Sequence, residues 1–167
     1  GGVGAYLEYF KNEWFHTDQR LANNDFDCIQ SWITGYDVNQ GDASLSFLEG
    51  SHKYHGEFRN DFNMKDHKDF KKDWLKINDE QVNYFIDKGC ERRCVTCKAG
   101  SLVLWDSRLM HCGKEPLKDR KDQKFRNVVY ICMMPRTLCS HANIKKRIKA
   151  FEELRMTTHW PHNPKLF

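Results

Sequence analysis

Two histidines and one aspartate in this chain have the types and spacing of a metal-binding site. His16-Thr17-Asp18 is an H-x-D tripeptide, and His111 follows much later in the chain. Residues i and i+2 of an extended strand project to the same side, so one short segment can supply both an imidazole and a carboxylate. Two neutral imidazoles and one carboxylate can occupy one face of an octahedral Fe(II), leaving three positions for a chelating co-substrate and O₂. His16, Asp18 and His111 therefore predict a mononuclear Fe(II) site.

Arg126 is the candidate anchor for a co-substrate. It opens the apolar run 126–132, which is the next such run after residues 101–105 and His111. A planar guanidinium can bind a carboxylate through two parallel hydrogen bonds, a geometry that lysine cannot reproduce. We therefore expect Arg126 to bind a carboxylate beside the metal, with Arg108 and Arg120 as the next candidates. The alternative is an ordinary ion-pair or surface arginine at the start of a strand.

The elements that must position these side chains can be read from the apolar pattern. Residues 43–48 alternate small or polar with large apolar side chains, as a half-buried strand does. Residues 54–72 are polar without a sustained apolar period, and we interpret them as an insertion or lid-like excursion. Further strands are expected at 28–34, 93–98, 102–105 and 127–133, a turn at 39–42, and helices at 78–89 and 140–155, the last with Ile144, Ile148 and Phe151 on one face.

Short strands punctuated by glycine turns, without strand–helix alternation, favour a mainly β jelly roll or related sandwich. In such a fold the first and penultimate core strands can meet at one mouth of the barrel. His16, Asp18 and His111 would converge there.

The order of several short motifs resembles the phytanoyl-CoA dioxygenase family of Fe(II)/2-oxoglutarate-dependent oxygenases. The resemblance covers about residues 13 to 135 and rests on His16-Thr17-Asp18, Trp32, Glu49-Gly50-Ser51-His52-Lys53, the run from Ala99 to Arg108, His111 and Phe125-Arg126. It implies a double-stranded β-helix (jelly roll, cupin-like) with flanking helices. It also implies that His16, Asp18 and His111 bind iron, that Arg126 pairs with the distal carboxylate of 2-oxoglutarate, and that Trp32 lines the co-substrate pocket.

The activity that this resemblance implies is hydroxylation of a small-molecule or lipid-like substrate, with release of succinate and CO₂. Fe(II), 2-oxoglutarate and O₂ would be required. Related halogenases carry a small residue in place of the carboxylate, so Asp18 favours hydroxylation. A non-catalytic jelly-roll module that kept the metal triad is the main alternative.

Length and charge narrow the class of protein. We expect one domain over residues 1–167, apparently without the N-terminal extension usual in the family. The net charge of +4 is modest and both signs are interspersed, so no nucleic-acid partner is expected. Residues 145–147 are interpreted as the solvated side of a helix.

No apolar stretch approaches the roughly 18 residues of a membrane span, and a soluble, intracellular and cytoplasmic protein is expected. The sequence leaves the oligomeric state open.

Three of the seven cysteines have the spacing of a known metal-binding motif. Cys90, Cys94 and Cys97 have the C-x3-C-x2-C spacing that holds an iron–sulfur cluster in radical enzymes resembling the S-adenosylmethionine family. Here the motif enters an apolar strand late in a short chain, so we interpret these residues as strand and turn positions. A zinc site that adds Cys112, or a cluster, remains an alternative.

Two further groups have possible supporting roles. Asp106 and Arg108 are expected to form an ion pair that orients the loop carrying His111, or else to be exposed. Trp105 is interpreted as a core residue. The C-terminal aromatic and histidine residues could cover the site or a partner surface, although a surface tail is the preferred interpretation; they are His159, Trp160 and His162.

Overall fold

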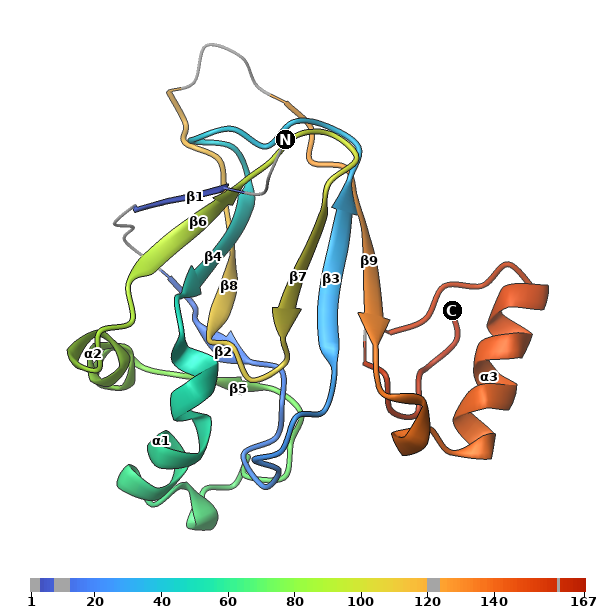
Figure 1. Cartoon of the computed structure of the whole chain (residues 1–167), viewed down its shortest axis with the longest axis horizontal. Coiled ribbons are helices and arrows are strands. Elements are labelled where there is room, and N and C mark those ends of the chain that lie inside the picture. Colours follow the sequence, from blue (N-terminus) through green and yellow to red (C-terminus); the bar gives the residue numbers. More distant parts are fainter. Residues whose placement is uncertain (1–3, 8–12, 120–123, 159) are drawn as a thin grey trace.

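The computed structural model describes residues 4–7, 13–119, 124–158 and 160–167, which form two antiparallel β-sheets with short helices attached (Figure 1). One sheet has six strands in the order β1-β6-β4-β8-β2-β5, and the other has three in the order β7-β3-β9. The mainly β jelly roll predicted from the sequence is confirmed. The strands are β1 Gly4–Leu7, β2 His16–Thr17, β3 Ile29–Thr34, β4 Ser44–Leu48, β5 Leu75–Lys76, β6 Arg92–Thr96, β7 Leu102–Asp106, β8 His111–Lys114 and β9 Val128–Met133.

The helices lie outside the two sheets. Helix α2 begins with a capping box, in which the Gln81 backbone N–H donates to Asn78 Oδ1 (2.9 Å) and the Asn78 backbone N–H donates to Gln81 Oε1 (3.0 Å). Gly89 follows its end with a positive φ of 85°, as a helix terminator does. Both predicted helices are confirmed. The helices are α1 His55–Asp61, α2 Asp79–Asp87 and α3 His141–Glu152, with short 3₁₀ helices at Ser51–Tyr54, Met64–Asp66 and Arg136–Leu138.

The interpretation of residues 54–72 as a polar excursion needs correction. This segment contains helix α1 and a 3₁₀ turn, and its side chains Phe58 and Met64 are buried in the core. The Phe58 ring packs against those of Phe62 and Phe85, with centroids 5.1 and 5.2 Å away. A seven-residue helix is too short to establish an apolar period in the sequence, so its two anchoring side chains gave no recognisable signal.

Two hydrophobic clusters stabilise the fold. The first contains residues of α1, α2 and the chain around β2, including Phe15, Phe58 and Phe85. The second lies between the two sheets, because it joins Trp32 and Val103 of the three-stranded sheet to Leu45 and Val95 of the six-stranded sheet. Leu45 and Trp105 of this second cluster line a cavity together with His16 of β2 and His111 of β8.

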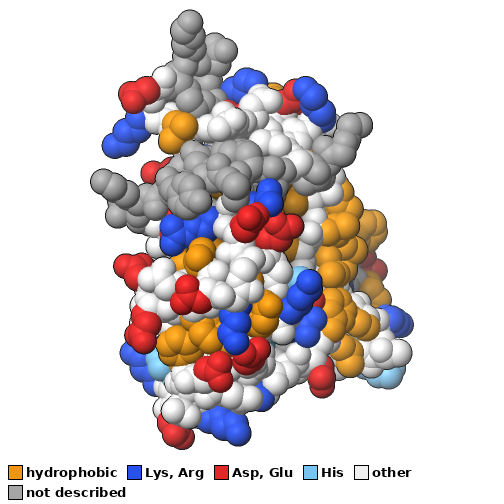
Figure 2. Space-filling model, turned by 60° about the vertical axis from the view of Figure 1, so that its left-hand side comes forward, with side chains coloured by type: hydrophobic (Ala, Val, Ile, Leu, Met, Phe, Trp, Pro, Cys, Tyr) orange, Lys and Arg blue, Asp and Glu red, His pale blue; other side chains and the backbone are white. Residues whose placement is uncertain are grey.

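The outer face of the three-stranded sheet carries exposed apolar side chains. Ile33 pairs with Leu102 on one side and with Val129 on the other, so the three side chains share a face, and each is exposed. Figure 2 shows hydrophobic side chains gathered in a band along one side of the molecule. The opposite face of this sheet, which carries Gln30 and Trp32, is buried.

The side of helix α3 that is buried differs from the apolar face that the sequence predicts. Ile148 and Phe151 share a face, as their spacing predicts, but they are 51% and 82% exposed. Asn143 and Ala150 are buried instead. No helix within the described ranges is long and apolar enough to cross a membrane.

Candidate metal centre

His16 and His111 are brought together by strand pairing. The two residues are direct cross-strand partners in the antiparallel pair of β2 and β8, and their ring centroids lie 4.5 Å apart. Asp18 follows β2 and faces the same side as His16, as the H-x-D spacing predicts. The segment is held on its other edge by β5, in which Lys76 pairs with His16.

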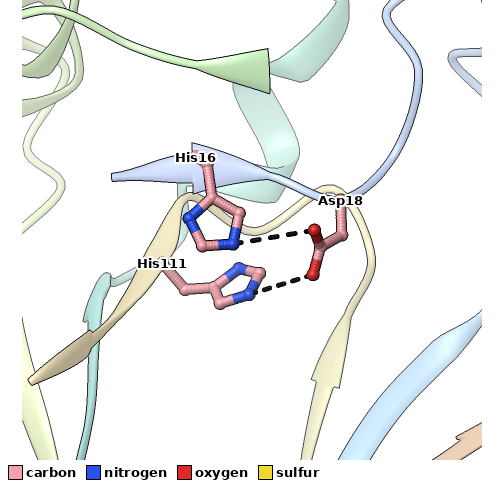
Figure 3. A group of neighbouring side chains, drawn as sticks. All are labelled: His16, Asp18 and His111. Atoms are coloured by element: carbon pink, nitrogen blue, oxygen red, sulfur yellow. Dashed lines mark ion pairs between the residues drawn. The ribbon is translucent and has the colours of Figure 1, made fainter. Parts of the chain in front are cut away.

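The three side chains present their ligand atoms to one point (Figure 3). His16 Nε2 lies 3.6 Å from Asp18 Oδ1, and His111 Nε2 lies 3.3 Å from Asp18 Oδ2. One ligand atom from each of the three residues lies within 4.8 Å of the others, and all three residues are buried. Within the described part of the chain, this is the one group of histidine, cysteine and acidic side chains that is close enough to hold a metal ion.

Backbone carbonyls fix the orientation of both imidazoles. His16 Nδ1 lies 3.3 Å from the Trp14 carbonyl oxygen, and His111 Nδ1 lies 2.9 Å from that of Leu109. A carbonyl oxygen can only accept, so each Nδ1 donates, and in a neutral imidazole Nε2 then carries the lone pair that a metal ion held between the two rings and Asp18 would need. Two neutral nitrogen donors and one carboxylate suit Fe(II), and this donor set therefore fits the predicted metal.

Trp14 adds an aromatic contact to this arrangement. Its ring stacks on His16 with centroids 4.7 Å apart and an interplanar angle of 10°. Its indole N–H donates to the Gly113 carbonyl oxygen at 3.2 Å. Trp14 thus contacts both strands that carry histidines.

Gln30 is a site residue that the sequence reasoning missed. Its amide nitrogen donates to Asp18 Oδ2 (2.7 Å), and its amide oxygen accepts from the Trp105 indole N–H (2.9 Å). Gln30 is 2% exposed on an inner face otherwise occupied by Trp32 and Thr34. A long amide side chain within the apolar run 28–34 was the available signal, since buried polar groups need a partner.

A cavity of about 400 Å³ opens beside the three side chains. Arg126 lines this cavity, and its Nη1 donates to the Tyr130 hydroxyl at 2.9 Å. The triad and the predicted carboxylate anchor therefore face one space. The residues lining it are Trp14, His16, Asp18, Gln30, Ser31, Leu45, Trp105, His111, Gly113, Arg126, Tyr130 and Ile131.

Trp32 occupies a different position from the one expected. Its side chain is completely buried and is not among the described residues that line the cavity. Its ring lies 5.7 Å from the guanidinium carbon of Arg126, a cation–π contact. A direct role for Trp32 in co-substrate binding stays a prediction; the contact observed is with the arginine.

The predicted ion pair of Asp106 and Arg108 is confirmed. Arg108 Nη2 and Nε lie 2.7 and 2.9 Å from the two carboxylate oxygens of Asp106. Burial alone would raise the pKa of Asp106, but the hydrogen bonds from Arg108 outweigh it and hold the pKa below its usual value.

Ser107, which lies between Asp106 and Arg108 in the sequence, makes two further hydrogen bonds. Its Oγ donates to Gln19 Oε1 (2.8 Å), and its carbonyl oxygen accepts from the Thr17 hydroxyl (3.3 Å). The loop that precedes His111 is thereby joined to the H-x-D segment.

The cysteines of the C-x3-C-x2-C spacing are distributed over the core. Cys94 lies in β6, whereas Cys90 belongs to the first hydrophobic cluster and Cys97 to the second. All seven cysteines are free thiols. Burial raises the pKa of Cys90 and Cys97, and that of Cys112 to about 12. Among the described residues, the histidine, cysteine and acidic side chains that lie close enough together to hold a metal ion include none of these thiols.

The C-terminal segment contacts the chain before β3. His162 Nε2 lies 2.6 Å from Asp27 Oδ1. Trp160 is partly buried and does not line the cavity. His159, the remaining residue of that group, and Arg120, one of the alternative anchors, lie outside the described residues; Arg108, the other alternative, is engaged by Asp106.

Comparison with known proteins gives two results. Residues 9–116 match the family model described as phytanoyl-CoA dioxygenase, a range that includes His16, Asp18 and His111 but ends before Arg126. A curated protein of Aspergillus versicolor, "Ava biosynthesis cluster protein O", is 28% identical over 155 residues, which cover 89% of this chain and 48% of that protein. The chain thus spans about half the length of this relative. The family match covers well over half of the chain, which therefore belongs to the phytanoyl-CoA dioxygenase family.

Proposed function

We propose that this chain forms the catalytic domain of an Fe(II)/2-oxoglutarate-dependent dioxygenase that hydroxylates a small organic substrate. One observation carries the proposal. The ligand atoms of His16, Asp18 and His111 lie within 4.8 Å of one another beside a cavity that Arg126 also lines. Family membership supports the reaction class.

His16, Asp18 and His111 would hold Fe(II) through two imidazole nitrogens and a carboxylate. When bound, Fe(II) and 2-oxoglutarate supply the oxidising chemistry, in which decarboxylation to succinate and CO₂ is coupled to insertion of one oxygen atom of O₂ into a C–H bond. The chain's own task is to orient these groups and to limit the access of water. The buried position of the triad serves that task.

Arg126 would bind the distal carboxylate of 2-oxoglutarate. Its guanidinium is held by the Tyr130 hydroxyl on one side and by the Trp32 ring on another, so its fork is oriented before the co-substrate arrives. A pre-oriented fork loses less conformational entropy on binding than a free arginine would. Arg126 would thereby set the direction in which the co-substrate enters the cavity.

The remaining cavity wall suggests the kind of substrate. Apart from the triad and Arg126, the lining is uncharged and rich in aromatic and aliphatic side chains, chiefly Trp14, Leu45, Trp105, Tyr130 and Ile131. Such a wall favours an apolar portion of a small-molecule or lipid-like substrate next to the metal. The retained carboxylate of Asp18 favours hydroxylation over halogenation.

Succinate release tests this function. The protein would be purified anaerobically, loaded with Fe(II) and supplied with 2-oxoglutarate, O₂ and candidate substrates. We expect 2-oxoglutarate-dependent succinate formation that a true substrate stimulates and that Asp18→Ala abolishes. Equal succinate formation by the wild type and Asp18→Ala would contradict the proposal. Tight binding of iron and 2-oxoglutarate without any turnover would instead identify the non-catalytic jelly-roll module.

A further inference from the structure

Asp18 is connected to Trp105 through a continuous hydrogen-bonded chain. Gln30 and Trp105 are direct cross-strand partners in β3 and β7, and both are buried. The indole N–H donates to the Gln30 amide oxygen, and the Gln30 amide nitrogen donates to Asp18 Oδ2. Each of these polar side chains therefore has its partner inside the protein.

The two hydrogen bonds that link Trp105, Gln30 and Asp18 can run in only one direction. An indole N–H can only donate, so it selects the oxygen end of the Gln30 amide. The nitrogen end must then face Asp18, and it approaches Oδ2 at 2.7 Å. A carboxylate oxygen that accepts such a bond cannot turn freely, so the Gln30 amide restrains the rotation of Asp18.

The same tryptophan contacts a second member of the triad. The Trp105 ring lies 5.5 Å from that of His111, centroid to centroid. One side chain of β7 therefore touches His111 directly and Asp18 through Gln30, although these two residues come from segments 93 positions apart in the sequence.

We propose that Gln30 and Trp105 are a positioning pair that holds Asp18 in the orientation required for metal binding. The inference rests on the proposed function, because it assumes that the triad binds a metal. Groups that orient metal ligands by hydrogen bonding typically change metal affinity by 10- to 100-fold when they are removed. Neither residue is required to touch the metal itself.

Two variants remove single links of the chain. Gln30→Met keeps the length and burial of the side chain but cannot donate to Asp18. Trp105→Phe keeps a ring against His111 but loses the N–H that orients the amide. We expect Co(II) affinity, measured by anaerobic calorimetry, to fall roughly 10- to 100-fold in Gln30→Met and less in Trp105→Phe. The visible spectrum of bound Co(II) should also change, which a loss of stability alone would not cause.

The double variant tests whether the two residues act in series. If Trp105 acts through Gln30, the double variant should lose no more Co(II) affinity than Gln30→Met alone. Thr34→Val is a matched control, since it removes the partly buried hydrogen bond of another buried side chain on the same strand, in which Thr34 Oγ1 donates to the Tyr36 carbonyl oxygen (2.7 Å). Its Co(II) affinity and spectrum should match those of the wild type.

The outcomes separate this inference from the proposed function. A wild-type protein that binds no Co(II), or binds it equally well after His16→Ala, would overturn the proposed metal centre and the positioning pair with it. If the wild type binds Co(II) through the triad but Gln30→Met and Trp105→Phe retain its affinity and spectrum, only the positioning pair is wrong. Either variant suffices for this result if the other fails to fold.

A separate observation concerns two cysteines 104 residues apart. Cys132 Sγ in β9 lies 3.7 Å from Cys28 Sγ, which immediately precedes β3. Cys28 is buried, Cys132 is partly exposed, and both are free thiols. The Cys132 thiol donates to Cys28, and this hydrogen bond lowers the pKa of Cys28 despite its burial and raises the pKa of Cys132.

We infer that Cys28 and Cys132 form a reversible disulfide when the protein meets a hydroperoxide. One sulfur attacks the peroxide, the O–O bond breaks, and a sulfenic acid and water result. The second thiol then attacks the sulfenic sulfur, the S–S bond forms, and a second water leaves. The two sulfurs together lose two electrons, which reduce one H₂O₂ to two H₂O.

Mass spectrometry of the intact protein tests this modification site. With iron removed by a chelator, stoichiometric H₂O₂ should lower the mass by two hydrogen atoms, and a thiol reductant should restore it. Cys28→Ser and Cys132→Ser should each abolish this change. Cys139→Ser, which alters another partly buried cysteine, should retain it. A mass gain of oxygen without loss of hydrogen in the wild type, or a disulfide that persists in both serine variants, would overturn the inference.

Discussion

His16 and His111 face one another across the antiparallel pair of β2 and β8, with ring centroids 4.5 Å apart. Strand β2 has only two residues, so little backbone pairing holds His16 in place. The contact with His111 on one side and the stacked ring of Trp14 on the other compensate for the short strand. The geometry of the triad therefore depends on side-chain packing as well as on the sheet.

Replacing Trp14 should weaken metal binding. Its side chain is 42% exposed, so a leucine in its place should lower the free energy of unfolding by no more than about 1.5 kcal/mol. Loss of the stacking on His16, worth about 0.5–1.5 kcal/mol, should weaken Co(II) binding by roughly 2- to 10-fold. Trp74→Leu is the control, since Trp74 is 45% exposed and contacts His16 only in a tilted arrangement at 5.7 Å. Equal effects of the two substitutions on calorimetric affinity would argue against a specific role for Trp14.

Replacing Arg126 should weaken 2-oxoglutarate binding and leave metal binding intact. Arg126→Lys keeps the charge but loses the two-pronged geometry, and the cost should be about 1.5–3 kcal/mol, or roughly 10- to 100-fold in apparent affinity. Tyr130→Phe removes only the hydroxyl that holds the guanidinium and should have a smaller effect in the same direction. Titration of the metal-loaded protein measures both. Unchanged 2-oxoglutarate affinity in Arg126→Lys and Arg126→Ala would move the anchor to another residue.

The site shows how far residue types and spacing can predict a structure. Extended geometry predicts that His16 and Asp18 share a side, because the period of a strand is two residues. The meeting with His111 depends on the register of β2 with β8, which local sequence does not encode. That convergence was predicted from the jelly-roll expectation and the family resemblance.

The residues whose roles the sequence did not predict have one physical cause in common. Gln30 lies in an apolar run, and its role follows from a cross-strand neighbour 75 positions away. Phe58 belongs to a helix of one or two turns that shows no period. Strand and helix positions with clear alternation or caps were predictable, whereas side chains whose role depends on tertiary partners were not.

His55 should make stability depend on pH in the acid range. Burial is the main cause that lowers the pKa of His55 to about 4, and its Nδ1 has no hydrogen-bond partner among the described residues. Above about pH 6.5 the imidazole is neutral in both states and has no effect. Between pH 6.5 and 4 the unfolded chain binds a proton that the folded protein does not, so the free energy of unfolding should fall with decreasing pH, by at most about 3 kcal/mol.

Denaturant unfolding at several pH values tests this expectation against a variant. His55→Gln keeps a group able to donate to the Gln19 carbonyl oxygen but does not titrate. The variant should lose less stability than the wild type between pH 6.5 and 4. Parallel stability curves for the two proteins over that window would contradict a buried neutral His55.

Cys90 and Cys94 should tolerate substitution without effect on the metal. Both side chains are buried in the core, so Cys90→Ser and Cys94→Ser should each cost about 1 kcal/mol of stability through packing and an added hydroxyl. The double variant should still fold and bind Fe(II). If it instead loses a stoichiometric zinc ion or a sulfide-dependent absorption band and unfolds, these thiols form a metal site after all.

Anaerobic titration of the metal-free protein with Fe(II), followed by 2-oxoglutarate, tests the central claim most directly. We predict a single Fe(II) per chain and a weak visible absorption band that develops only after 2-oxoglutarate is added. His16→Ala and His111→Ala should fold but lose both signals, since the remaining ligands hold Fe(II) poorly against water. Near-normal iron affinity and an unchanged 2-oxoglutarate-dependent band in either variant would contradict the proposed metal centre.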